Sequence, residues 1–285
     1  MYLTEDKPNP TADRRGDDIW SRAGMFAGAV LGSRFPRQRH RGKPEGTMRN
    51  RFHGQLDELD EMLVKMAEAS TAAIQRANWA LLHNDSESVE QVHDTALAIS
   101  AQFRRIEELA FLLLARQQPV ASDLRLIIVS QHAAADLDRM GQLAGHIAKI
   151  ARRHYPDCLV RIDGCAPIRE MATVAEQIAA KAADAIRGRD AVLAAELERD
   201  DDRIDALHRR LWTTLLGGWR DGTESAIDAA MVGRFYERYA DHAVNAARQV
   251  EYLVTGRACR HGRLDRRRVG PVVSSRPWLP AVILR

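Results

Sequence analysis

Apolar residues in the middle of the chain recur at alternating steps of three and four positions. Such a stripe is typical of a helix that packs one face against other helices. The clearest stripes are Phe52, Leu56, Leu59, Leu63 and Met66; Ala133, Leu137, Met140, Ala144 and Ile147; and Val232, Tyr236, Tyr239, Ala243, Ala246, Val250 and Leu253. Because no alternating strand pattern of useful length accompanies them, the chain is predicted to be all-α.

Turn-forming residues divide this middle region into about six helices. The dividing positions are Asn84-Asp85-Ser86, Pro119, Pro156 to Pro167, Gly188, and Gly217-Gly218 with Gly222. The segments between them are longer than the average helix of about 11–12 residues. Long helices joined by short connections predict a helical bundle.

The second half of this region repeats features of the first. At an offset of 105 residues Asp85 aligns with Asp190, and at an offset of 99 residues Arg139 aligns with Arg238. Any two amphipathic helices align passably on apolar positions, but charged matches in a consistent order favour a duplication. The prediction is a pseudo-symmetric six-helix bundle of two three-helix repeats, at 48–158 and 159–256.

Charge and proline separate the ends of the chain from its middle. Residues 1–47 carry a net charge of +3 and residues 257–285 carry +7, so the region between them carries −7. Seven of the ten prolines also lie in the two ends. Since proline interrupts helices and neither end has a helical or strand period, both ends are predicted to be disordered extensions.

Short apolar runs and three cysteines limit the classes of protein that fit. No run approaches the ~20 residues that span a bilayer, and Thr4-Glu5-Asp6 is not the start of a secretory signal. Cys158, Cys165 and Cys259 have neither metal-ligand spacing nor the arrangement of a disulfide framework. These features predict a cytoplasmic protein.

Carboxylates four residues apart occur twice in the second half, as Asp201 with Asp205 and Glu237 with Asp241. This spacing puts each pair on one helical face, where like charges repel. Two such pairs on facing helices would offer oxygen ligands to a hard or borderline cation, with His208 as a further ligand or a supporting group. Acidic pairs on helices are more often solvated surface, so the spacing alone leaves both interpretations open.

Three motifs resemble the two halves of the PhoU family, whose members are accessory and regulatory proteins of the phosphate-specific transport system. The first-half motifs are 115–125 (ARQQPVASDLR) and 136–141 (DLDRMG), and the second-half motif is 235–243 (FYERYADHA). The resemblance extends over 48–256, is specific because the motifs occur in order and in duplicate, and is greatest to actinobacterial members. It implies a bundle of two three-helix repeats, as the periodicity also predicts.

The resemblance implies a regulator rather than an enzyme. A member of this family is expected to be a cytoplasmic adaptor, in part at the inner face of the membrane. It would couple the phosphate ABC transporter to the sensor histidine kinase, repress the phosphate-starvation response and lower phosphate uptake when phosphate is plentiful. A homodimer is expected, and nucleic acid is not an expected partner.

The resemblance also implies surface metal ions held by paired acidic motifs in each repeat. In the second repeat these motifs are Asp201, Asp205, Glu237 and Asp241. Their first-repeat equivalents are Ala96, Ser100, Asp138 and Gln142. Because three of these four lack a carboxylate, one site is predicted, in the second repeat, for iron, zinc, manganese, nickel or magnesium.

Two alternative functions use other features of the sequence. A ferritin-like di-metal oxidase needs paired Glu-x-x-His motifs, whereas among the acidic pairs only Asp205-x-x-His208 comes close and Ala240 follows Glu237 by three. Nucleic-acid binding would use the arginine-rich tail, although no folded recognition motif accompanies it. The tail arginines are Arg260, Arg263, Arg266, Arg267 and Arg268.

Overall fold

The structure is a computed structural model that describes residues 45–159 and 165–257. Residues 48–159 and 165–257 belong to one compact unit. Residues 45–47, predicted to belong to the N-terminal extension, instead form the start of a helix. Adding a residue to an existing helix costs little compared with nucleating one, so a helix can run past the end of its apolar stripe. Apart from these residues and Arg257, the two predicted extensions lie outside the described residues.

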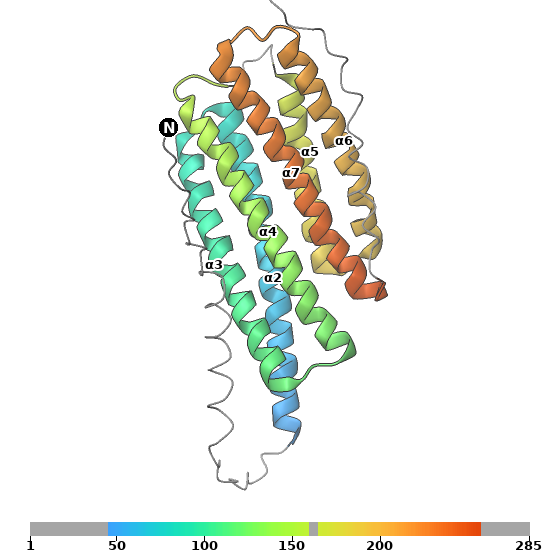
Figure 1. The fold of residues 1–285 in the computed structure, drawn as a ribbon. Coiled ribbons are helices and arrows are strands. Elements are labelled where there is room, and N and C mark those ends of the chain that lie inside the picture. The colour runs from blue at the N-terminus through green and yellow to red at the C-terminus, as the bar shows by residue number, and fades with distance from the viewer. Residues whose placement is uncertain (1–44, 160–164, 258–285) are drawn as a thin grey trace, which may run out of the picture. The chain divides into compact units, whose positions relative to one another are not determined.

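Six long α-helices make up almost all of the described chain, which contains no strand (Figure 1). They are α2 (Glu45–His83), α3 (Ser86–Gln117), α4 (Ala121–Arg153), α5 (Ala166–Gly188), α6 (Ala191–Leu216) and α7 (Gly222–Thr255). The prediction of an all-α bundle of six helices is therefore confirmed.

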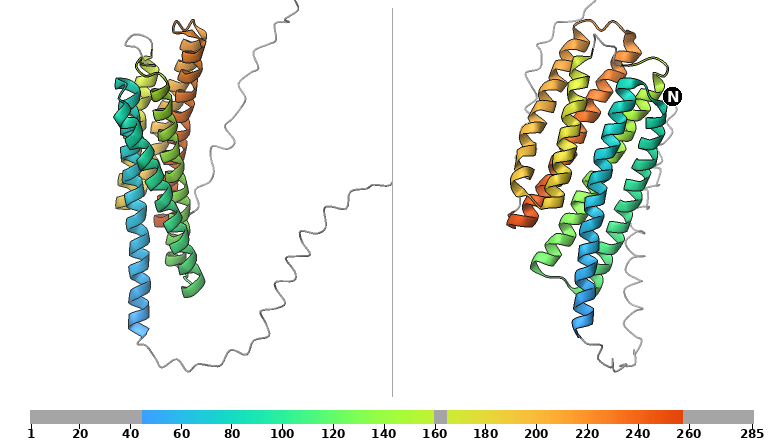
Figure 2. Two further views of the ribbon diagram at one scale, coloured as in Figure 1. Left: turned by 90° about the vertical axis from the view of Figure 1, so that its left-hand side faces the viewer. Right: turned by 180° about the vertical axis from the view of Figure 1, so that it is seen from behind.

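Within residues 48–257 the helices form two groups of three. Helices α2, α3 and α4 make the first group and α5, α6 and α7 the second, with α4 packed along α7 between them (Figures 1 and 2). Helices α3 and α6 lie at the two outer edges. The repeats are thus joined by the inner helices, which are α2, α4, α5 and α7. Each outer helix belongs to one repeat alone.

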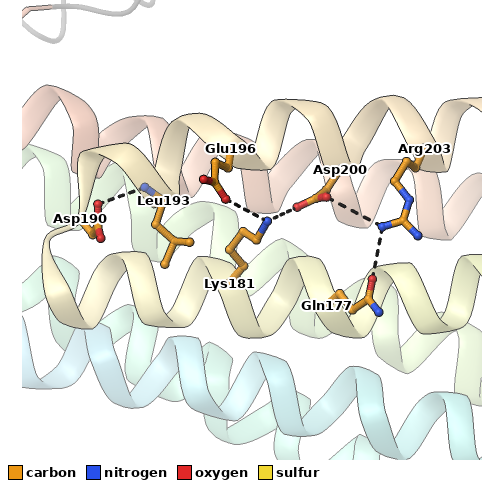
Figure 3. Close-up of polar contacts among 7 residues, drawn as sticks. All are labelled: Gln177, Lys181, Asp190, Leu193, Glu196, Asp200 and Arg203. Atoms are coloured by element: carbon orange, nitrogen blue, oxygen red, sulfur yellow. Dashed lines mark hydrogen bonds and ion pairs between the residues drawn. The ribbon is translucent and has the colours of Figure 1, made fainter.

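The turns at the start of the outer helices show the duplication in backbone detail. Asn84 and Arg189, 105 residues apart, both adopt the left-handed conformation, with φ of 58° and 49°. Each precedes an aspartate, Asp85 or Asp190, whose carboxylate caps the following helix. Figure 3 shows the Asp190 carboxylate accepting a hydrogen bond from the backbone N–H of Leu193, at 3.0 Å. The same turn is therefore built twice from the same capping chemistry.

The apolar stripes predicted from the sequence form the core of the bundle. Every member of the three stripes is buried except Leu253, which is half-buried near the end of α7. Burying each large aliphatic side chain contributes about 1.5–3 kcal/mol, so this continuous stripe is the main source of stability.

Buried hydrogen bonds fix the inner helices against one another. The Tyr236 hydroxyl donates to Asn78 Oδ1 at 2.6 Å, and Asn78 Nδ2 donates to the Ala172 carbonyl at 3.0 Å. The Tyr239 hydroxyl donates to the Ser70 carbonyl at 3.1 Å. Because a buried polar group without a partner costs about 1–3 kcal/mol, these bonds specify which helix faces meet across the two repeats.

Candidate metal site and its first-repeat counterpart

Helix geometry separates the three consecutive aspartates of α6. The Asp200 carboxylate accepts from Lys181 Nζ of α5 at 2.6 Å (Figure 3). This bond raises the pKa of Lys181. Asp201 is almost fully buried, whereas Asp202 is exposed. Each residue of a helix is turned by about 100° from the last, so the acidic run serves three different environments rather than one site.

Asp205 is the electrostatic centre of the predicted site. The pKa of its carboxyl group is raised, first because the group is partly buried, and then because Glu237 and Asp241 of α7 lie nearby. Burial and neighbouring like charges both disfavour the ionised form. The structure therefore brings three of the four predicted carboxylates, from two helices, into one electronegative region. Asp201 precedes Asp205 by about one turn of α6 and is buried.

His208 links the two helices beside these carboxylates. Its Nε2 accepts a hydrogen bond from Trp212 Nε1 at 3.1 Å, and its Nδ1 lies 3.3 Å from Glu237 Oε2. An acceptor at Nε2 and a carboxylate at Nδ1 fit the neutral ring with its proton on Nδ1. Burial, which outweighs the opposing effect of Glu237, lowers the pKa of His208.

Gly233 allows α6 and α7 to approach closely at this point. A Cβ atom built on Gly233 would lie 2.5 Å from Leu211 Cδ2 and 3.2 Å from the His208 ring. Since real Cβ contacts are longer, a larger residue would force the side chains of Leu211 and His208 to move. The absence of a side chain at Gly233 therefore makes room for the His208 ring between the two carboxylate-bearing helices.

Glu237 has a cationic neighbour that the sequence analysis did not include. Arg234, three residues earlier on α7, forms an ion pair with its carboxylate. The i, i+3 spacing was the available signal, because such residues are neighbours on a helix surface. Glu237 therefore faces both a cation and His208, whereas Asp205 faces other carboxylates.

The donor set of this region fits a hard or borderline cation. Two helices supply carboxylates that repel one another, so an ion between them would replace repulsion with attraction. As the side chains lie, no three His, Cys, Asp or Glu residues within 45–159 and 165–257 are grouped closely enough to hold an ion. Ligation would require side-chain rotation, for which Glu237 would exchange its contacts with Arg234 and His208. The metal site and its four ligands remain predictions.

In the first repeat, neutral hydrogen bonds occupy the equivalent region. Ser100 Oγ donates to Asp138 Oδ1 at 2.5 Å, and Gln142 Nε2 donates to Asp138 Oδ2 at 2.7 Å. Asp138 is buried, and Ala96 offers no donor atom. Both oxygens of the single carboxylate are thus engaged by neutral groups of the protein itself. That a metal site in the first repeat is lost or very weak stays a prediction, for which these hydrogen bonds offer a physical reason.

Arg125 of the first-half motif has a role that sequence reasoning missed. Arg125 lies near the start of α4, and its side chain reaches the C-terminal end of α7. Nη1 donates to the Leu253 carbonyl at 3.4 Å, and the guanidinium lies 5.6 Å from the centre of the Tyr252 ring. A cation is favourable at a helix C-terminus. Gly256, with φ of 68°, leaves room for the guanidinium.

A buried carboxylate at the opposite end of the same helix pair was also missed. The carboxylate of Asp228, on α7, accepts hydrogen bonds from Arg153 Nη2 at 2.5 Å and from His154 Nε2 at 2.9 Å. A buried charge requires such partners. Contacts at both ends, Arg125 with Leu253 and Arg153 with Asp228, show that α4 and α7 run antiparallel.

The two alternative functions gain nothing from the described residues. On α7, the position three after Glu237 is the buried Ala240, so α7 supplies no carboxylate-x-x-His pair to face Asp205 and His208. The arginine-rich tail proposed for nucleic-acid binding lies outside the described residues. Among the helices that are described, none contains an apolar stretch long enough to cross a membrane.

Comparison with known proteins finds one family in both halves of the chain. The model of the PhoU domain matches residues 63–151 and again residues 168–250. The first match includes part of α2, all of α3 and most of α4, and the second includes most of α5, all of α6 and most of α7. The duplication inferred from charged matches therefore coincides with two copies of one domain.

Similar proteins include full-length relatives and solved structures. The "Phosphate-specific transport system accessory protein PhoU homolog 2" of Mycobacterium tuberculosis is 42% identical over 73% of this chain and 99% of its own. The corresponding homologue of Pseudomonas aeruginosa is 32% identical, over 75% and 90%. The crystal structure of PhoU from P. aeruginosa has a TM-score of 0.65 at 29% identity and covers 72% of this chain and 100% of that chain. The two domain matches and these relatives establish that the chain belongs to the PhoU family, of the actinobacterial type.

Proposed function

We propose that this protein is the regulatory accessory component of a phosphate-specific transport system. It would act as a cytoplasmic adaptor between the phosphate ABC transporter and the sensor histidine kinase. When phosphate is plentiful, it would lower phosphate uptake and hold the kinase away from autophosphorylation. The observation that carries the proposal is the match of the PhoU domain to both repeats, together with relatives named as accessory proteins that it matches over nearly their whole length.

The mechanism would be state-dependent binding without a catalytic step. An adaptor shifts a kinase between states only by binding one state more tightly than the other. We further propose that the protein is a homodimer and that one metal ion is held by Asp201, Asp205, Glu237 and Asp241, where it would offset the repulsion around Asp205.

Gene deletion tests the regulatory proposal directly. In a strain that lacks this gene and any paralogues, phosphate-scavenging genes should be expressed in phosphate-rich medium. Re-expression of the full chain should restore repression. The readout is transcript abundance of the scavenging genes together with uptake of radiolabelled phosphate. Normal repression in the complete deletion strain would refute the proposed function.

An in vitro measurement separates the adaptor from the kinase's own behaviour. Autophosphorylation of the purified kinase in membranes would be measured with and without the full chain and the transporter. The proposal expects the chain to reduce autophosphorylation only when the transporter and phosphate are also present. Inhibition that needs neither of them would contradict the coupling role.

A further inference from the structure

A cluster of cations lies on the helix pair α4 and α7, within a region whose net charge is negative. It consists of Arg139, His146 and Lys149 on α4 and Arg238 on α7, all of them exposed. We name these four residues the α4–α7 basic face. Burial, then Lys149, Arg139 and Arg238 in that order, lower the pKa of His146. Three positive charges thus act on one ring, as expected where cations lie close together.

The repeat symmetry explains why the two arginines meet. Arg139 and Arg238 are equivalent at the offset of 99 residues and follow the equivalent acidic residues Asp138 and Glu237. Helices α4 and α7 pack antiparallel, and each arginine occupies the equivalent position on its own helix. The two arginines therefore lie at the same level along the helix pair. One arginine from each repeat therefore contributes to a single surface.

Four other arginines on these two helices are bound to carboxylates, and Arg125 lies at one end of the helix pair against the Leu253 carbonyl. The pairs are Arg152 with Glu90, Arg153 with Asp228, Arg234 with Glu237 and Arg248 with Glu198. Arg139 instead donates to the neutral Gln142 Oε1 at 2.6 Å. A guanidinium bonded to an amide keeps its full charge available, so the basic face attracts anionic groups more strongly than the paired arginines around it.

The spacing of the cations favours an extended partner over a single small anion. Arg139 and Lys149 are ten residues apart, so they are separated by about 15 Å along α4. One phosphate ion cannot bridge that distance. Apolar groups adjoin the cations, since Phe235 packs on His146 with ring centres 5.2 Å apart and Met231 is 43% exposed. A mixed surface of this kind is typical of a protein interface.

A discrete protein partner also fits better than a lipid bilayer. Asp136 lies on the same helix pair, where it bonds His242 across α4 and α7 at 2.9 Å. Fixed carboxylates of this kind would repel the phosphates of a continuous anionic surface, whereas a folded partner can place its own charges to avoid them.

We propose that the α4–α7 basic face docks onto a carboxylate-bearing cytoplasmic surface of the phosphate transporter. This inference rests on the proposed function and adds to it the surface and the chemistry of the contact. Charge complementarity of this kind sets association rate and partner choice.

The test compares two double variants of the full chain with the same change in net charge. Arg139→Glu with Arg238→Glu reverses the basic face. Arg76→Glu with Arg105→Glu is the matched control, because these two arginines are also exposed, on α2 and α3. Affinity for membrane vesicles that contain the phosphate transporter would be measured for each. Circular dichroism and thermal unfolding would verify that both variants fold.

The proposal expects the basic-face variant to bind at least about tenfold more weakly, with little change in the control. Equal binding by wild type and the basic-face variant would overturn it, as would an equal loss in both variants. Basic-face-dependent binding to transporter-free vesicles of phosphatidylglycerol and phosphatidylcholine would assign the surface to lipid instead. Competition by inorganic phosphate but not by sulfate at equal ionic strength would assign it to the free ion. Failure of the wild type to bind the transporter would refute the proposed function as well.

Discussion

Equivalent helix positions in the two repeats create opposite electrostatic environments. In the first repeat Asp138 is the one carboxylate, and Ser100 and Gln142 satisfy both of its oxygens. In the second repeat, partial burial and then the neighbouring carboxylates of Glu237 and Asp241 raise the pKa of Asp205. One region is closed by neutral hydrogen bonds, and the other retains repulsion that a cation would relieve.

This difference shows how a duplicated fold can divide structural and binding roles. Replacing charged ligands with neutral donors turns a repulsive patch into a bonded contact between α3 and α4. The corresponding patch between α6 and α7 keeps its carboxylates at a cost to the metal-free protein. The backbone geometry of the two repeats, including the Asp85 and Asp190 caps, stays the same.

The largest expected effect is on metal binding by the second repeat. Asp205→Asn with Asp241→Asn should abolish stoichiometric metal in the purified protein, because two carboxylate ligands lose their charge. Elemental analysis after equilibration with iron, zinc or manganese provides the measurement. Asp138→Asn is the matched control in the first repeat and should leave the bound metal unchanged. Undiminished metal in the double variant would show that the ligands are assigned wrongly.

A graft of carboxylates into the first repeat would test whether the difference lies only in those four positions. Ala96→Asp, Ser100→Asp, Asp138→Glu and Gln142→Asp together reproduce the second-repeat set. The grafted protein should bind one additional metal ion, and the free ion should raise its melting temperature. If the graft folds but binds no extra ion, features beyond the four ligands must distinguish the repeats.

Removing a carboxylate should lower the free energy of unfolding by different amounts in the two repeats. Asp138→Ala should destabilise the protein by about 2–3 kcal/mol, because it leaves two donors without their acceptor in a buried site. Glu237→Ala in metal-free protein should cost about 1 kcal/mol or less, because the lost contacts with Arg234 and His208 are offset by reduced repulsion of Asp205. Urea unfolding of both variants in the presence of a chelator measures the difference. If both variants lost the same free energy of unfolding, repulsion between the carboxylates of the second repeat would be negligible.

The smallest expected effect is a dependence on pH at Asp205. Its raised pKa means that ionisation is less favourable in the folded protein than in the unfolded chain, so this group destabilises the metal-free protein as pH rises through the raised pKa. Asp205→Asn should therefore stabilise metal-free protein by a few tenths of a kcal/mol near neutral pH. The gain should vanish as pH falls toward the ordinary aspartate pKa of 3.8. A gain independent of pH would point to a packing effect instead.

Sequence patterns predicted the helices and the two-repeat plan because both depend on local features. Apolar spacing identifies the buried face of a helix, and turn residues mark its ends. Asp85 and Asp190 stood out as equivalent through the 105-residue offset, and each caps a helix as part of the same turn. The acidic pairs also follow from spacing, since residues four apart must share a helical face.

Contacts between distant residues could not be predicted in this way. Nothing near Arg125 in the sequence indicates that it reaches Leu253, and nothing near Asp228 indicates Arg153 and His154. The same limit applied to Asp138, because Ser100 lies on another helix and its bond depends on how α3 and α4 pack. Such pairings depend on helix packing, which one-dimensional periodicity does not contain.

The order of residues is enough to predict which segments form helices, which face of each helix is apolar and where the carboxylates lie along them. The environment of each charged group depends on how the helices pack: packing surrounds Asp138 with donors, buries Asp205 beside other carboxylates, and brings Arg139 and Arg238 onto one surface. The cause is the distance along the chain over which each kind of interaction acts. Helix propensity and amphipathic spacing act within a few turns, whereas repulsion, burial and cross-helix hydrogen bonds depend on the packing of segments far apart in the chain.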